Sequence, residues 1–268
     1  MPQPDLDDLL DVANALADAA RAPILTHFRS EDLSADNKLA DGFDPVTIAD
    51  RAAEAAMRAV LRERRPDDAV HGEEEGLTPG TTGLTWVLDP IDGTRAFIAG
   101  APTFGVLISV HDGTKPILGM IDQPYIGERF IGLPDRGAAE LARGASRRAI
   151  KTRRGRALSD ATVLTTFPEV GDADEYAGFR AVSEKARLTR YGLDCYGYAL
   201  VALGQADLVI EAGLNAYDIQ GPMAVIQAAG GVVTDWRGDP CDQGGRAVAA
   251  GDPALHEEAL RLLAPFAG

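Results

Sequence analysis

The spacing of apolar residues divides the chain into helical and extended segments. Apolar residues recur at helical spacing over Leu6–Phe28 and over Thr47–Arg65, which predicts two amphipathic helices. Pro66 follows the second segment and is expected to end it. The polar stretch 30–45 between them indicates a loop. The Thr/Gly/Pro-rich stretch 77–83 is typical of a loop that can move.

Short apolar runs bounded by turn residues predict strands. In the first half we expect strands at 69–71, 84–88, 104–110, 117–121 and 128–131. Because the last three follow one another through short turns, they predict an antiparallel meander. The second half mixes strands at 161–165, 207–211 and 232–234 with helices near 173–186, 198–203, 216–229 and 253–264. This mixture favours a layered α+β or α/β fold over a simple doubly wound sheet.

A basic stretch, Arg143–Arg156, separates the two halves. It predicts an exposed hairpin or connection and is the candidate boundary between two lobes. The first lobe would span 1–145 and carry most of the acidic motifs. The second would span 146–268.

The charge of the chain limits the function classes it can serve. The 268 residues carry a formal charge of −15, which repels nucleic acid and anionic membranes. A phosphate ester would therefore need local positive charge, most simply from a bound metal. No apolar run reaches the roughly 20 residues of a membrane span, and the acidic N-terminus predicts no signal peptide. Cys195 and Cys241 lie in unrelated contexts, so reduced thiols in a cytoplasmic protein are expected.

The segment Trp86–Thr94 carries the strongest chemical signal. It places Asp89 and Asp92 on either side of a proline, after a buried strand and before a predicted rigid turn and helix start. Two carboxylates at a strand end can hold a hard cation. The amides of Gly93 and Thr94 could bind an anion beside it. Hydrolysis of a phosphate ester needs such a pair of sites.

Three further acidic clusters lie at the ends of predicted elements: Glu73-Glu74, Asp50 and Tyr217-Asp218. Each has a structural alternative, because Glu73-Glu74 could be a solvated charge run, Asp50 a surface helix residue and Asp218 a helix cap. Carboxylates that converge from separate segments repel one another unless a cation lies among them. Mg²⁺ suits such all-oxygen ligands and can serve phosphoryl chemistry.

Four motifs follow one another along the chain: Gly72-Glu73-Glu74, Asp89-Pro-Ile-Asp92-Gly93-Thr94, Tyr217-Asp218 and Ala228–Gly231. In this order they resemble the inositol monophosphatase family of Mg²⁺-dependent, lithium-sensitive phosphatases. The resemblance covers nearly the whole chain. It implies an αβαβα five-layered sandwich of the inositol monophosphatase/fructose-bisphosphatase type, and a homodimer.

The resemblance also implies a set of two or three Mg²⁺ ions. Their expected ligands are Glu73, Asp89 and the backbone carbonyl of Ile91 for the first ion, and Asp89, Asp92 and Asp218 for the second. Glu73 and Asp50 would serve a weaker third site, with Glu74 beside it. Thr94 and Glu73 would position and deprotonate the attacking, metal-activated water. The amides of Gly93 and Thr94 would bind phosphate, and Asp218 would also contact the substrate.

Two positions depart from the family pattern. Family members often have Trp where this chain has Tyr217, and Arg95 follows Thr94. Arg95 is either a surface residue or a substrate contact. Neither departure removes an expected ligand.

The choice of substrate rests on other motifs. Several segments resemble the histidinol-phosphate phosphatase branch of the family: Arg190–Tyr198, Asp207–Glu211, Ile121–Pro124 with Gly127–Arg129, and Gly231–Trp236. Histidinol carries an ammonium group and an imidazole, and the carboxylates of Asp194 and Glu211 could bind them. Asp194 could instead cap a loop. Arg190 could contact phosphate, a dimer partner or a surface acid.

We therefore expect a Mg²⁺-dependent phosphomonoesterase that hydrolyses L-histidinol phosphate, as in histidine biosynthesis. An inositol-1-phosphate phosphatase or a broad-specificity phosphatase remains the alternative, because hydroxyl groups can also be bound by acids. A bisphosphatase would need a second basic pocket, which the sequence does not indicate. A non-catalytic metal-binding module would be expected to lack a ligand or Thr94, and all are present.

Overall fold

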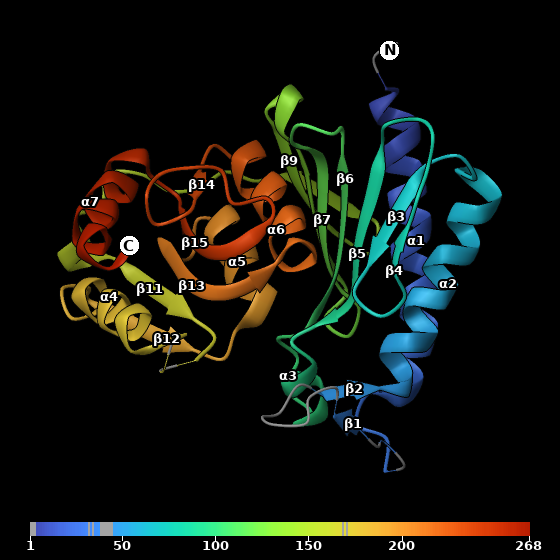
Figure 1. Cartoon of the computed structure of the whole chain (residues 1–268), viewed down its shortest axis with the longest axis horizontal. Coiled ribbons are helices and arrows are strands. Elements are labelled where there is room, and N and C mark those ends of the chain that lie inside the picture. The colour runs from blue at the N-terminus through green and yellow to red at the C-terminus, as the bar shows by residue number, and fades with distance from the viewer. Residues whose placement is uncertain (1–3, 32, 34, 38–44, 168, 170) are drawn as a thin grey trace.

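The computed structural model describes residues 4–31, 33, 35–37, 45–167, 169 and 171–268. Two sheets lie side by side, with helices between them and on both outer faces (Figure 1). The helices are α1 (Leu6–His27), α2 (Ile48–Arg64), α3 (Thr94–Ile98), α4 (Ala173–Ser183), α5 (Asp194–Ala202), α6 (Ala216–Ala228) and α7 (Pro253–Leu263).

The strands fall into three groups. A small pair is formed by β1 (Ala35–Asn37) and β2 (Pro45–Thr47). The first large sheet contains β3 (Ala69–Gly72), β4 (Gly76–Thr78), β5 (Thr85–Asp92), β6 (Gly105–His111), β7 (Pro116–Gln123), β8 (Glu128–Leu133), β9 (Ala138–Arg143) and β10 (Ser146–Ala149). The second contains β11 (Thr162–Thr165), β12 (Leu188–Tyr191), β13 (Leu208–Asn215), β14 (Val232–Thr234) and β15 (Gly244–Ala250).

The first sheet has the order β10-β9-β8-β7-β6-β5-β3-β4, and only the β3–β5 pair is parallel among its described strands. The predicted meander is therefore confirmed as β6-β7-β8. The apolar stripes of α1 and α2 pack on one face of this sheet, with Leu9, Leu16 and Met57 fully buried. The two amphipathic helices predicted from the N-terminal periodicity thus form the outermost layer.

Helix α6 covers the opposite face of the first sheet, and two strand glycines let it approach. A Cβ on Gly119 would lie 2.3 Å from the carbonyl oxygen of Gly221, and one on Gly132 would lie 2.4 Å from Cα of Val225. Both distances are far below van der Waals contact. The backbone of α6 therefore rests directly on β7 and β8, and most of its residues are buried.

The second sheet has the order β12-β11-β13-β15-β14, with β11 parallel to β12 and β13. Side chains of α5 and α6 pack against one face, together with the inner face of the first sheet. Side chains of α4 and α7 pack against the other. The layers therefore alternate helix, sheet, helix, sheet, helix (Figure 1), which confirms the predicted αβαβα sandwich.

Several strands differ from the sequence-based expectation. Part of the predicted loop 30–45 forms β1 and β2, and 38–44 lies outside the described residues. Residues 77 and 78, predicted within the loop 77–83, instead belong to β4 and pair with β3. Strands β12 and β15 were not predicted. The Gly- and Ala-rich sequence of β15 has low β propensity, so its pairing depends on its neighbours β13 and β14.

The first part of the basic stretch forms the exposed strand β10, which pairs antiparallel with β9 in a hairpin. The first sheet thus extends to Ala149, and the division at 145/146 stays a prediction. Cys195 and Cys241 are free, and both are buried. Within the described residues, the helices are all too short or too polar to cross a bilayer. The cytoplasmic location and the homodimer stay predictions.

Candidate metal centre and active site

A bulge at the end of β5 brings Asp89 and Asp92 to the same side. Residues three apart on a regular strand point to opposite faces. The register between β5 and β6 shifts between Asp89 and Asp92, which inserts extra backbone at Pro90-Ile91. The amide of Ile91 donates to Asp89 Oδ1 at 3.0 Å and fixes this bulge. The strand therefore runs through the motif to Asp92. The prediction that it ends at Leu88 and that a turn follows directly is wrong.

The chain then turns sharply into α3. Gly93 has a φ of +83°, in the left-handed region that glycine adopts most readily. A Cβ at this position would lie 2.8 Å from Cγ of Asp194. Both observations require glycine here, so the backbone of Gly93 and Thr94 can face the cavity closely.

Asp218 completes a carboxylate trio from a different part of the chain. It is the third residue of α6, and the amide of Asn215 donates to its Oδ2 at 2.6 Å. Asp218 thus takes part in capping the helix, which was the structural alternative to a metal ligand. Its carboxylate also belongs to the cluster, since ligand oxygens of Asp89, Asp92 and Asp218 lie within 4.8 Å of one another.

Asp92 links the two halves of the molecule. Its Oδ2 accepts a hydrogen bond of 2.6 Å from the amide of Cys195, in the first turn of α5. The α6 residue Asp218 also has a carboxylate oxygen within 4.8 Å of Asp92. The cluster therefore forms only where β5, α5 and α6 meet.

The electrostatics of this cluster favour a cation. Burial, followed by the charges of Glu73, Asp92 and Asp218, raises the pKa of Asp89 well above its usual range. Burial, followed by Asp194 and Asp218, does the same for the pKa of Asp92. A hard cation among these oxygens would remove the repulsion. The donor set therefore fits the divalent metal predicted from the sequence.

Glu73 and Thr94 line the same cavity, of about 260 Å³. Glu73 directly follows β3, and its amide donates to the carbonyl of Leu88 at 3.1 Å. The Thr94 hydroxyl lies 3.1 Å from the Ile91 carbonyl oxygen and 3.4 Å from Asp50 Oδ1. Glu74 is next in the chain, and its amide is bound by Glu54.

Asp50 is buried, so the alternative that it is a surface helix residue is wrong. Its Oδ2 accepts hydrogen bonds from the amide and the hydroxyl of Thr47, at 2.9 and 2.5 Å, in the capping box of α2. Asp50 is not among the described residues that line the cavity, and it reaches the site through Thr94.

Two more carboxylates, Asp194 and Glu211, line the same cavity as the trio. Glu211 Oε1 accepts the amide and hydroxyl of Thr166 at 2.7 and 2.9 Å. Burial raises the pKa of Glu211 to about 7. Burial also raises the pKa of Asp194 to about 6. The sequence motifs thus identified two acids that the fold does place together.

Other lining residues were weakly signalled or not signalled in the sequence. Arg95 lines the cavity, and its guanidinium carbon lies 4.8 Å from the ring centre of Phe167. Thr166 and Phe167 lie in a loop without a recognisable pattern, so sequence reasoning missed them. Arg190 lies exposed on the edge strand β12 and is not among the described lining residues. Its role in substrate binding stays a prediction.

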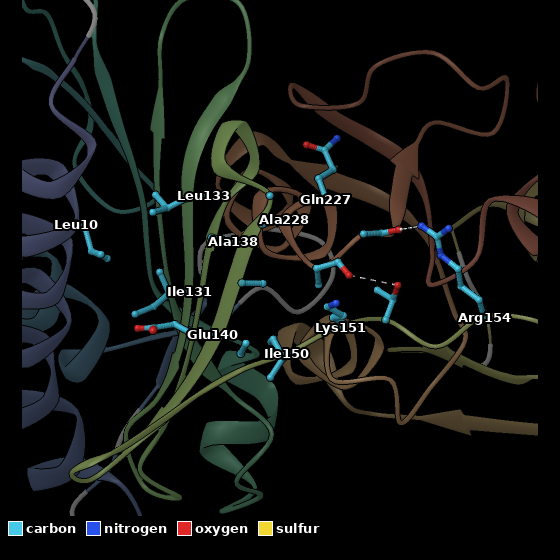
Figure 2. A pocket seen from close by; sticks show the side chains of 16 residues that line it. Leu10, Ile131, Leu133, Ala138, Glu140, Ile150, Lys151, Arg154, Gln227 and Ala228 are labelled. Atoms are coloured by element: carbon cyan, nitrogen blue, oxygen red, sulfur yellow. Dashed lines mark hydrogen bonds between the residues drawn. The ribbon is translucent and has the colours of Figure 1, made fainter.

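A larger cavity, of about 880 Å³, lies at the β9 edge of the first sheet. Figure 2 shows its mostly apolar wall, with Leu10, Ile131, Leu133 and Ile150, and with Arg154 donating to the Gly230 carbonyl oxygen at 2.9 Å. The described residues that line it include none of the predicted site residues. The smaller acidic cavity is therefore the candidate active site.

Comparisons with known proteins identify the family of the chain. Residues 5–265 match the inositol monophosphatase family. The chain is 41% identical to the bifunctional phosphatase IMPL2, chloroplastic, of Arabidopsis thaliana, over 97% of this chain and 76% of that protein. It is 35% identical to the histidinol-phosphatase of Streptomyces coelicolor, over 97% and 98%.

Solved structures show the same relation. An inositol monophosphatase from Zymomonas mobilis superposes with a TM-score of 0.85 at 39% identity, covering 98% of this chain and all of that one. Sequence and fold therefore lead to one conclusion: the chain belongs to the inositol monophosphatase family of metal-dependent phosphatases.

Proposed function

We propose that this protein is a Mg²⁺-dependent phosphomonoesterase that hydrolyses L-histidinol phosphate to L-histidinol and phosphate. The observation that carries the proposal is the pairing of two acidic groups in one cavity. The trio Asp89, Asp92 and Asp218 suits a metal, while Asp194 and Glu211 line the same cavity and suit a cationic leaving group. The similarity to a histidinol-phosphatase over nearly the whole chain supports the same substrate.

The residues that would hold Mg²⁺ follow from the resemblance, and the cluster of Asp89, Asp92 and Asp218 supports this choice. Glu73, Asp89 and the Ile91 carbonyl would hold one ion, and Asp89, Asp92 and Asp218 a second, with Asp50 and Glu73 serving a weaker third. When bound, Mg²⁺ would neutralise phosphoryl oxygens and lower the pKa of water.

The protein's own groups would then orient the reaction. The backbone amides of Gly93 and Thr94 would bind phosphate oxygens, since no Cβ at residue 93 blocks their approach. The Thr94 hydroxyl and the Glu73 carboxylate would hold the attacking water, and Glu73 would accept its proton. The Ile91 carbonyl oxygen and Asp50 Oδ1 would accept from the Thr94 hydroxyl and fix its position.

The other two carboxylates of the cavity would bind the leaving alcohol. Asp194 and Glu211 are buried acids that can pair with the ammonium and imidazole groups of histidinol. Phe167, held against Arg95, offers an aromatic surface at the exposed rim. These contacts would place the ester oxygen over the trio.

Inositol 1-phosphate is the second candidate substrate. The similarity to a solved inositol monophosphatase supports it, and acids can accept hydrogen bonds from a polyol. The two substrates differ in charge, so a direct comparison separates them.

The deciding experiment measures phosphate release from histidinol phosphate and from inositol 1-phosphate at equal concentration, with Mg²⁺ and with EDTA. We expect release with Mg²⁺ only, and a higher kcat/KM for histidinol phosphate. A preference for inositol 1-phosphate would overturn the substrate assignment. No release from any phosphate monoester with Mg²⁺ present would refute the enzymatic function.

A further inference from the structure

Glu54 is a fully buried carboxylate on α2 that points at the connection between β3 and β4. Its Oε2 accepts a hydrogen bond of 2.7 Å from the amide of Glu74, and its Oε1 accepts one of 3.0 Å from the amide of Glu75. Helix α2 runs alongside β4 at this edge of the molecule (Figure 1). One helical side chain thus binds two consecutive amides of the acidic turn.

The same carboxylate also packs on the backbone before Glu73. A Cβ on Gly72 would lie only 2.1 Å from Glu54 Oε1. Glycine at this position lets the carboxylate sit directly against the chain. Residue 73 is therefore flanked by Gly72, which is packed on Glu54, and by Glu74, which is hydrogen-bonded to it.

Arg58, one turn later and also buried, extends this hold to the far side of the turn. Its Nε donates to Glu54 Oε1 at 2.8 Å, one terminal nitrogen donates to the Gly76 carbonyl at 2.6 Å, and the other donates to Thr78 Oγ1 at 3.0 Å. The planar guanidinium can make these bonds at once because its donors are fixed in a fork.

Such a buried pair adds little net stability, because desolvation of both charges offsets their attraction. It does fix geometry, since each charge is satisfied only in one arrangement of the turn. Glu73 lies inside that arrangement and lines the acidic cavity. Displacing the turn would move the Glu73 carboxylate relative to Asp89.

We propose that Glu54 and Arg58 are positioning residues that hold Glu73 in place for metal binding, so that α2 sets part of the metal affinity of the site. This rests on the proposed function, in which Glu73 is a metal ligand. Neither residue faces the cavity, so both would act only through the turn.

The test compares wild-type protein with Glu54→Gln, which keeps the shape but replaces one acceptor oxygen with a donor. Mn²⁺ binding to the metal-free protein is followed by loss of the free-ion signal in electron paramagnetic resonance. The Mg²⁺ concentration for half-maximal phosphate release is measured in parallel. We expect the Mn²⁺ dissociation constant and the half-maximal Mg²⁺ concentration each to rise by about 10–100-fold, as for other groups that support metal ligands. The kcat at saturating Mg²⁺ should stay close to wild type.

Asp207→Asn provides the matched control. Asp207 is also buried, pairs with Arg153 and accepts the amide of Thr162 at 2.7 Å, but on the second sheet. It should lower the melting temperature and leave Mn²⁺ binding unchanged. Wild-type Mn²⁺ affinity in Glu54→Gln, or an equal loss of affinity in Asp207→Asn, would overturn the proposal.

Arg58→Lys decides the matter if Glu54→Gln does not fold. Lysine keeps the charge beside Glu54 but cannot bind Gly76 and Thr78 together, so we expect a smaller loss of Mn²⁺ affinity than in Glu54→Gln. An unchanged Mn²⁺ affinity in Arg58→Lys would refute the proposal. The binding measurement needs no substrate. The protein could release no phosphate and still bind Mn²⁺ in a way that depends on Glu54. That result would refute the proposed function and leave this inference standing.

Discussion

A buried aspartate lies near each end of strand β5, and the surroundings of the two differ in sign of charge. Near the start of the strand, Asp68 accepts hydrogen bonds from Arg65 Nε at 2.7 Å, Trp86 Nε1 at 2.9 Å and Thr82 Oγ1 at 2.5 Å. Near its end, Asp89 is surrounded by other carboxylates. Both side chains are almost inaccessible to solvent.

The pKa values record this difference. Burial alone would raise the pKa of Asp68, but the hydrogen bonds from Arg65, Thr82 and Trp86 outweigh it, and the pKa is lowered. Burial and neighbouring carboxylates raise the pKa of Asp89. A buried acid whose donors come from the protein is structural, whereas acids crowded together require a cation from outside.

The largest expected effect tests the carboxylate-rich end. Asp92→Asn should reduce Mg²⁺-dependent phosphate release by more than the roughly 100-fold typical of a group that only supports a ligand, because a ligand itself is lost. Its melting temperature in EDTA should not fall, since one of several repelling charges has been removed. A near-wild-type rate would contradict the ligand assignment.

Gly93→Ala should come next. The left-handed φ costs alanine about 1–2 kcal/mol, and the new Cβ would press on Asp194. We expect kcat/KM to fall by roughly 100-fold, as for a displacement near 1 Å in an active site. Gly127→Ala is the control, because Gly127 has a φ of +78° and no atom within 4 Å of its Cβ position. Similar activity losses in both variants would show that strain alone is responsible.

Glu211→Gln should affect substrate choice more than chemistry. Loss of one charge-assisted hydrogen bond, about 1.5–3 kcal/mol, predicts a KM for histidinol phosphate at least about tenfold higher, with little change for inositol 1-phosphate. Because burial raises the pKa of Glu211 to about 7, its charge develops as pH rises through 7. The substrate's imidazole and phosphate titrate in the same range, so the wild type and the variant are compared. Between about pH 6 and 8, the KM for histidinol phosphate should fall more for the wild type than for the variant. An unchanged pH profile would exclude Glu211 from binding the cation.

The smallest effect on activity is expected at the other end of β5. Asp68→Asn should lower the free energy of unfolding by about 1–3 kcal/mol at pH 7, because a buried charged hydrogen-bond network is broken, while kcat/KM stays near wild type. The folded-state pKa of Asp68 is lowered, so its contribution is present above the unfolded-state value of 3.8 and is lost as pH falls through the folded-state value. Chemical denaturation at pH 7 and below pH 4 measures this. A constant difference between wild type and variant across that range would contradict the lowered pKa.

Much of the fold follows from local patterns. The periodicity of Leu6–His27 and Ile48–Arg64 and the short turns between β6, β7 and β8 are visible in sequence, because helices and hairpins depend on near neighbours. β15 was missed because its alanines gain strand structure only from β13 and β14.

The site was predictable in composition but not in geometry. The motif identifies Asp89 and Asp92, yet only the bulge against β6 brings them to one side. Likewise, Asp50 resembles a surface residue until α2 is capped and packed. Glu54 carries no sequence signal at all, since its partners lie some twenty residues ahead. Register and packing depend on tertiary contacts, which local sequence does not encode.

The close seating of α6 on Gly119 and Gly132 has a consequence for biosynthesis. Strands β6 to β8 leave the ribosome well before the helix that covers them. At ~5–20 residues per second, an apolar sheet face stays uncovered for several seconds in every new chain. The two glycines present no side chain that could shield it meanwhile. Slow translation between β10 and α6 should therefore increase the demand for chaperones that bind nascent chains.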